Sequence, residues 1–261
     1  MNGHSNVERL ACGILDFGRR LGTVGDEDDA PIFVFAAGPG SGEHALVERL
    51  ARPVANEALF DRHVIASLAW QLVNLAGTTP KGNDAESASA RTRLVRRVAR
   101  VQAAFVREAC QVEGTDCMRR TAWRMMSRAL TGEEALYLRL IFPRAKFIFL
   151  HRHPVDAFSE FVGTAKKRKS VNGTPLHDSR PAGAFAEQWC HLVASFELWR
   201  KDVGGILIGH HLLALSQVDE VDAYLGERLL PRIAEGLPSD ETVDGALHEE
   251  DVALIVERTA E

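Results

Sequence analysis

A short apolar run that ends in a glycine loop constrains the fold of this chain more than any other feature. Residues Pro31–Ala37 are continuously apolar and too few for a buried helix, which is typical of a strand covered on both faces of a parallel sheet. The run continues into Gly38–Gly42, and Glu43–Leu50 then has helical character. A strand, a glycine loop and a helix in this order predict the first unit of an α/β fold.

The same order recurs later in the chain. Lys146–His151 predicts a second inner strand followed by a helix from Val155, and Gly205–Ile208 predicts a third strand. Helical periodicity fills most of the rest, over Asn6–Leu21, Val64–Leu75, Arg91–Val112, Gly132–Leu140, Gly183–Lys201, Val218–Leu225 and Glu249–Thr259. Thr78–Ser89 and Lys166–Arg180 are polar and predict loops. We expect a single α/β domain over residues 31–261, a parallel sheet flanked by helices, preceded by a helix and an acidic connector over residues 1–30.

Composition excludes several classes of protein. The 31 Lys and Arg residues are outnumbered by 36 Asp and Glu, for a net charge of −5, so no nucleic-acid partner is expected. The apolar runs fall far short of the roughly 20 residues that span a membrane, and no secretory signal is visible at the start. The four cysteines form no paired motif, which favours reduced thiols in a cytoplasmic protein.

The glycine loop has the elements of an anion site. A loop between a buried strand and a helix presents backbone N–H groups and a positive helix terminus to a phosphate. Ala37–His44 does not match the ATP-binding pattern GxxxxGK[ST], because Glu43 takes the place of the lysine, and an acid there would repel the β- and γ-phosphates. The glycines alone fit a structural tight turn equally well.

Two segments resemble the sulfotransferases. Pro39–Leu50 resembles the family's 5′-phosphosulfate loop and the helix that follows it. Phe142–Ala157 is a closer match, with Phe-Pro-x-Ala, an apolar strand and then Arg-x-Pro-x-Asp. In the family this arginine holds the 3′-phosphate of 3′-phosphoadenosine 5′-phosphosulfate (PAPS), and Arg152 stands at its position. Weaker similarity at Phe185–Phe196 and Tyr224–Gly226 extends the resemblance over most of residues 31–261.

The resemblance implies a P-loop-like sulfotransferase architecture and a sulfuryl transfer from PAPS, which leaves PAP. The acceptor would be a hydroxyl or amine of a small or carrier-bound molecule in the biosynthesis of a bacterial metabolite. The donor-binding positions that it implies are Pro39, Gly40, Ser41, Gly42, Glu43, His44, Ala45, Arg152, Ser159 and Glu160. Candidates for the catalytic base are His44, Glu57 and His63, although a surface histidine or a solvated glutamate explains each of them too.

Several of these positions depart from the family. Gly40 replaces a basic loop residue, and Glu43 and His44 replace a pair of hydroxyl residues. Glu160 stands where a serine normally follows the arginine, and Ser159 comes one position earlier. These departures leave open an alternative, in which the chain is a nucleotide-binding scaffold or regulatory subunit that has lost catalysis. No metal site is predicted, because the neighbouring His210 and His211 would point to opposite faces of a strand.

A basic helix stands outside these motifs. Arg91–Arg107 contains six arginines and no acid. At 100° per residue, five of the arginines share one side, Arg93, Arg96, Arg97, Arg100 and Arg107. The apolar residues are expected on the opposite, buried side, Leu94, Val95, Val98, Val101, Phe105 and Val106. The arginines are explained either by a solvated face or by an acidic protein partner.

Overall fold

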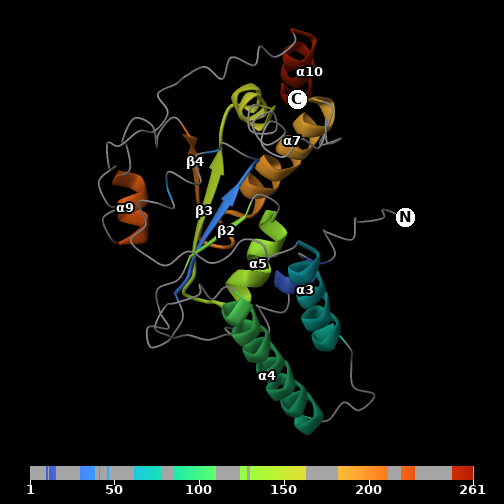
Figure 1. The fold of residues 1–261 in the computed structure, drawn as a ribbon. Helices are drawn as coiled ribbons and strands as arrows, with labels where there is room; N and C mark the ends of the chain where they lie inside the picture. The colour runs from blue at the N-terminus through green and yellow to red at the C-terminus, as the bar shows by residue number, and fades with distance from the viewer. Residues whose placement is uncertain are drawn as a thin grey trace, which may run out of the picture.

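A computed structural model describes residues 10, 12–15, 30–38, 41, 46, 62–77, 85–109, 124–127, 130–162, 182–210, 219–226 and 249–260. Its centre is a four-stranded sheet in the order β2-β1-β3-β4, in which every neighbouring pair is parallel (Figure 1). The strands are β1 (Ile32–Ala36), β2 (Arg124–Ser127), β3 (Lys146–His151) and β4 (Ile206–Gly209). The prediction of a parallel α/β sheet is therefore confirmed.

The strand order creates a switch point between β1 and β3. From β1 the chain crosses to β2 on one side, whereas from β3 it crosses to β4 on the other side. Connections that leave two adjacent parallel strands in opposite directions open a crevice at the carboxyl ends of those strands, which is where open α/β sheets bind ligands. The register pairs Ala36 with Leu150, so the ends of β1 and β3 lie level with each other.

One face of the sheet is lined with phenylalanines. Phe33, Phe35, Phe147 and Phe149 alternate along β1 and β3, and all are fully buried. They pack in one core with α3 (Arg62–Gly77), α4 (Ala85–Ala109), α5 (Gly132–Ile141) and α7 (Ala182–Trp199). The ring centroids of Phe149 and Phe196 of α7 are 4.8 Å apart. Alternation along a strand places every second side chain on this face.

The opposite face is aliphatic. Val34, Ile148 and Leu150 pack with Leu46 and with Val221 of α9 (Asp219–Leu225), so the sheet is covered on both faces, as its apolar runs predict. Tyr224 ties α9 to the start of β3, because its hydroxyl accepts a hydrogen bond from Phe147 N at 2.8 Å and donates one to Gly204 O at 2.8 Å. Burial raises the pKa of this phenol.

A buried carboxylate joins α5 to α7. Glu133 is 7% exposed, and it accepts hydrogen bonds from Ser195 Oγ at 2.7 Å and from Trp199 Nε1 at 3.0 Å. Burial by itself raises the pKa of Glu133, but the hydrogen bonds from surrounding side chains outweigh burial and lower it below its ordinary value. The two helices approach closely at Gly132, where an added Cβ would lie 2.6 Å from Ser195 O.

The predicted helices that fall within the described residues are present, but their ends differ from the predicted ones. The last helix, α10 (Glu249–Thr259), packs against α7, and residues 12–15 are helical as expected. One predicted loop is wrong in part, and one strand was missed. Residues 85–89 belong to α4 and not to a loop, because this segment lacks the glycine or proline that would stop a helix. The short strand β2 was not predicted at all, since Arg124–Ser127 lacks a sustained apolar run.

The apolar side of α4 is also only partly where the sequence places it. Val95, Ala99, Ala103 and Val106 are buried against the core. Leu94, Val101 and Phe105, expected to be buried, are 49%, 69% and 51% exposed. The buried face of α4 is therefore rotated about the helix axis relative to the predicted apolar side, and small residues lie at its centre. The reason is that α3 and α5 cover only part of the circumference of α4.

Candidate functional site

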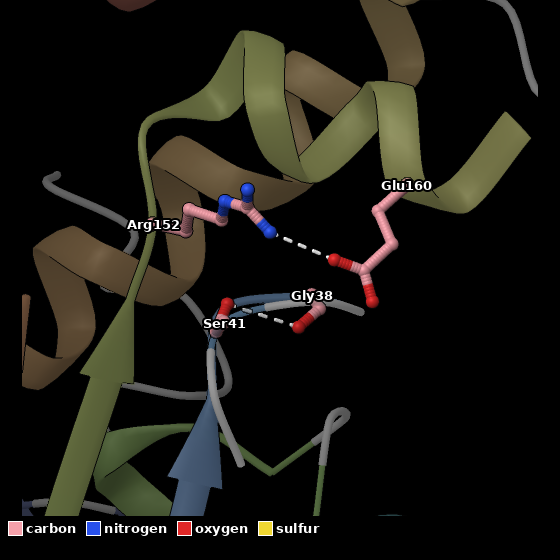
Figure 2. A network of polar contacts seen from close by, with 4 residues as sticks. All are labelled: Gly38, Ser41, Arg152 and Glu160. Atoms are coloured by element: carbon pink, nitrogen blue, oxygen red, sulfur yellow. Dashed lines mark hydrogen bonds and ion pairs between the residues drawn. The ribbon is translucent and has the colours of Figure 1, made fainter. Parts of the chain in front are cut away.

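The segments that follow β1 and β3 meet at the switch point. Ala37 N donates a hydrogen bond to Leu150 O at 2.9 Å, which extends the pairing of the two strands to their carboxyl ends. Gly38 and Ser41 lie beyond the end of β1, and Arg152 lies beyond the end of β3. Figure 2 shows these residues together with Glu160 at this edge of the sheet. The fold therefore joins the glycine loop and the arginine, which are more than a hundred residues apart in the sequence.

The start of the glycine loop is a closed turn. Gly38 has a φ of 106°, a conformation that only glycine adopts without strain. The Ser41 hydroxyl donates to Gly38 O at 3.0 Å, and Ser41 is fully buried (Figure 2). This hydroxyl holds the turn together from inside, so Ser41 shapes the loop through its side chain.

Arg152 is held through its backbone as well as its side chain. It lies between β3 and a helix over residues 154–162, which begins at the buried Pro154, and proline suits the first turn of a helix. Trp189 Nε1 of α7 donates to Arg152 O at 3.1 Å. The side chain of Arg152 is 23% exposed. The backbone of Arg152 is therefore held in place, and its guanidinium is still accessible to solvent at the carboxyl edge of the sheet.

Glu160 is the ion-pair partner of Arg152. Its Oε2 lies 2.8 Å from Arg152 Nη1, a short charge-assisted hydrogen bond (Figure 2). The Glu160 side chain is 45% exposed, so water screens the pair and it contributes little to stability. Its effect on an incoming ligand is larger, because an anion that approaches the guanidinium meets a carboxylate already bound there.

Aromatic rings border the turn. An added Cβ on Gly38 would lie 3.6 Å from the ring of Phe185, and the ring centroids of Phe185 and Phe158 are 5.2 Å apart. These rings belong to a small core that also contains Ala157 and Ile255. The turn thus has an apolar wall on the side of α7 and a charged pair on the side of the helix over residues 154–162.

The predicted site residues have different outcomes. The structure brings Arg152, Ser41 and Glu160 to one edge of the sheet, and Ser159 lies next to Glu160, half-buried on the same helix. His63 lies in α3, but its side chain is outside the described residues. The other predicted positions also lie outside them, Pro39, Gly40, Gly42, Glu43, His44, Ala45 and Glu57.

Two contacts were missed by sequence reasoning. The ion pair between Glu160 and Arg152 was not predicted, although an acid eight residues after the arginine was the available signal. The hydrogen bond of Trp189 to the backbone of Arg152 links residues 37 positions apart, and no local pattern indicates it. Across the described residues, no three His, Cys, Asp or Glu side chains group as metal ligands would. None of the helices described is long and apolar enough to cross a membrane.

Part of this chain is similar to known sulfotransferases. The sulfotransferase family profile matches residues 130–208, which contain α5, β3, Arg152, Glu160 and α7. A sulfotransferase domain from the curacin biosynthetic pathway is 16% identical with a TM-score of 0.46, over 79% of this chain and 77% of that one. A sulfotransferase from Mycobacterium avium is 12% identical with a TM-score of 0.41, over 98% and 75% of the two chains.

A mouse sulfotransferase complexed with PAP is 13% identical with a TM-score of 0.35, over 97% of this chain and 69% of that one. No curated protein sequence matches this chain significantly. The family profile confirms the resemblance that the sequence indicates, and it covers the segment that holds the arginine and its ion-pair partner.

Proposed function

We propose that this chain, which carries a sulfotransferase-family segment over residues 130–208, transfers a sulfuryl group from PAPS to a hydroxyl or amine of an organic acceptor. The observation that supports this most is the position of Arg152, beyond the end of β3 at the switch point and beside the turn after β1. A guanidinium there can hold a phosphate by two parallel hydrogen bonds. The acceptor is a small molecule or a group tethered to a carrier protein.

The residues at the crevice fit this donor in part. The turn at Gly38 brings backbone close to the ligand position. Arg152 supplies positive charge for the 3′-phosphate, and the Phe185 ring offers an apolar wall. Glu160 opposes the phosphate, so its carboxylate has to turn away from Arg152 when the donor binds.

The reaction is an in-line displacement at sulfur. The acceptor oxygen or nitrogen forms a bond to sulfur while the bond from sulfur to the bridging phosphate oxygen breaks. PAP leaves with that electron pair, and the acceptor proton passes to a base. Loop backbone N–H groups stabilise the charge that develops on the leaving phosphate. We assign the base to His44 on the loop or to Glu57 beyond the helix that is expected after it, with His63 as a third candidate.

A second candidate function rests on the ion pair. A carboxylate bound to the donor-binding arginine is also what a nucleotide-binding scaffold without turnover would tolerate. Calorimetry with PAP, followed by mass spectrometry of a panel of hydroxyl and amine acceptors incubated with PAPS, separates the two. Binding with sulfated product supports the enzyme, and binding without product across the panel supports the scaffold. If PAP does not bind at all, both candidates are wrong.

A further inference from the structure

The long helix α4 has three distinct faces. One is buried against α3 and α5 and includes Val95, Ala99 and Val106. A second is the arginine face, Arg93, Arg96, Arg97, Arg100 and Arg107. The third is an apolar stripe of Leu94, Val101 and Phe105, which are 49%, 69% and 51% exposed. At 100° per residue the centres of the three faces lie about 120° apart around the helix.

The buried face fixes the other two in position. Gln102 is 4% exposed, donates from Nε2 to Leu68 O of α3 at 3.0 Å and accepts from the Tyr137 hydroxyl of α5 at 3.0 Å. These buried hydrogen bonds set the rotation of α4 about its axis. The apolar stripe therefore cannot turn inward without breaking them, and its exposure is a property of the fold.

Together, the apolar stripe and the arginine face have the chemistry of a binding surface. Large apolar side chains that recur at spacings of seven and four residues follow the pattern by which one helix receives another. Within α4 the acids are Glu86 and Glu108, in the first and last turns, whereas six arginines lie between them. In a chain with a net charge of −5, this face is a local concentration of positive charge.

We propose that α4 docks an acidic amphipathic helix of a partner protein. The apolar side of that helix would cover Leu94, Val101 and Phe105, and its carboxylates would lie along Arg97 and Arg100. Such a helix can lie in the angle between the two faces and touch both. A flat lipid surface in contact with the stripe would leave the arginine face, about 120° away, turned from the headgroups.

A second copy of this chain fits the surface less well. It would present the same arginines, and an antiparallel pair of α4 helices would bring the two arginine faces to the same side, where like charges repel. Figure 1 also shows α4 toward the end of the sheet where β1 and β3 begin, whereas Arg152 follows the opposite end of β3. The bound helix would therefore be part of an assembly surface separate from the crevice.

The test uses the full chain and a synthetic probe. The probe is a fluorescent helical peptide with leucines at heptad positions a and d and glutamates at e and g, and its control peptide carries lysines in place of the glutamates. We expect the acidic peptide to bind in a salt-sensitive manner and the basic peptide not to bind. Phe105→Ser and Arg97→Glu should each weaken binding by about tenfold, the effect of an ordinary interface anchor.

Matched control variants are available on α7 and just beyond it. Leu198→Ser removes an apolar side chain that is 62% exposed, and Lys201→Glu reverses an exposed charge. Neither should change the affinity for the peptide, and the affinity of Phe105→Ser and Arg97→Glu for PAP should equal that of the wild type. Circular dichroism verifies that all four variants are folded.

Four outcomes would overturn the proposal. One is that the acidic peptide does not bind, and another is that the control variants weaken binding as much as the α4 variants. A third is self-association in sedimentation equilibrium that Phe105→Ser abolishes, since the occupant would then be a second copy. The fourth is binding to vesicles of phosphatidylcholine and phosphatidylserine that Arg97→Glu abolishes, since the surface would then belong to a membrane.

Discussion

The carboxylate of Glu160 lies 2.8 Å from the guanidinium of Arg152, at the edge of the sheet where β1 and β3 end. Glu160 comes from a helix that leaves this edge, whereas Arg152 directly follows a buried strand. The arginine that we propose for the 3′-phosphate is thus already paired with an acid of the same chain. Any anion that binds here has to compete with that acid.

Substitution of Arg152 tests the donor site. If its guanidinium holds the 3′-phosphate, Arg152→Ala should weaken PAP binding by about 1.5–3 kcal/mol, the scale of hydrogen bonds to a charged group. Adenosine 5′-phosphosulfate lacks this phosphate and should lose much less affinity. Isothermal titration calorimetry with both nucleotides measures the difference, and equal losses would contradict the assignment.

Substitution of Glu160 tests whether its carboxylate competes with PAP for the guanidinium of Arg152. Glu160→Gln removes the negative charge that pairs with Arg152, so PAP should bind more tightly by up to about 1 kcal/mol, the upper range for partly exposed pairs. In the Arg152→Ala background the same substitution should have no effect, because no guanidinium remains for Glu160 to pair with. Comparison of the two single variants with the double variant isolates the coupling between the two residues. A loss of PAP affinity in Glu160→Gln would mean that Glu160 orients Arg152 for binding.

The turn after β1 depends on Gly38. Gly38→Ala forces a side chain into a backbone with φ of 106° and should cost about 1–3 kcal/mol of unfolding free energy. The added Cβ would be 3.6 Å from Phe185, an ordinary contact, so the loss comes from the backbone. Urea unfolding measures it. Gly183→Ala in α7 is the matched control, because a helix favours alanine, and it should be neutral or stabilising; an equal loss in both variants would argue against strain at Gly38.

The buried carboxylate of Glu133 makes stability depend on pH. Its pKa is lower in the folded chain than its ordinary value of 4.5, so it stabilises the fold above that value and ceases to do so as the pH falls through the lowered pKa. Glu133→Gln should cost about 1–3 kcal/mol at neutral pH, because the hydrogen bonds from Ser195 and Trp199 are disturbed.

The loss of unfolding free energy caused by Glu133→Gln should shrink in acid, because the carboxyl group of Glu133 in the wild type is then protonated and uncharged, as the glutamine amide is. Urea unfolding at neutral pH and below pH 4.5 measures this change. Glu197→Gln, an exposed substitution on α7, is the control and should show no such change. A cost that is the same at both pH values would show that Glu133 is not charged in the fold.

Elements whose signals are local could be predicted from the amino-acid sequence alone. The apolar runs of β1 and β3 predict inner strands because a strand buried on both faces needs apolar residues at every position. The place of Arg152 directly after β3 could be predicted because its motif is a short, fixed spacing within one segment. The periodicity of α3, α5, α7 and α10 was likewise sufficient to predict those helices.

The relationships between distant segments could not be predicted in this way and are seen only in the folded chain. The place of β2 beside β1, the bond from Trp189 to Arg152 and the pairing of Glu160 with Arg152 all join residues that local patterns treat separately. The faces of α4 show the physical reason most clearly. Periodicity tells which residues share a side of a helix, but burial depends on how much of the circumference its neighbours cover. Here α3 and α5 cover the side of Val95 and Val106, and they leave Val101 and Phe105 exposed to solvent.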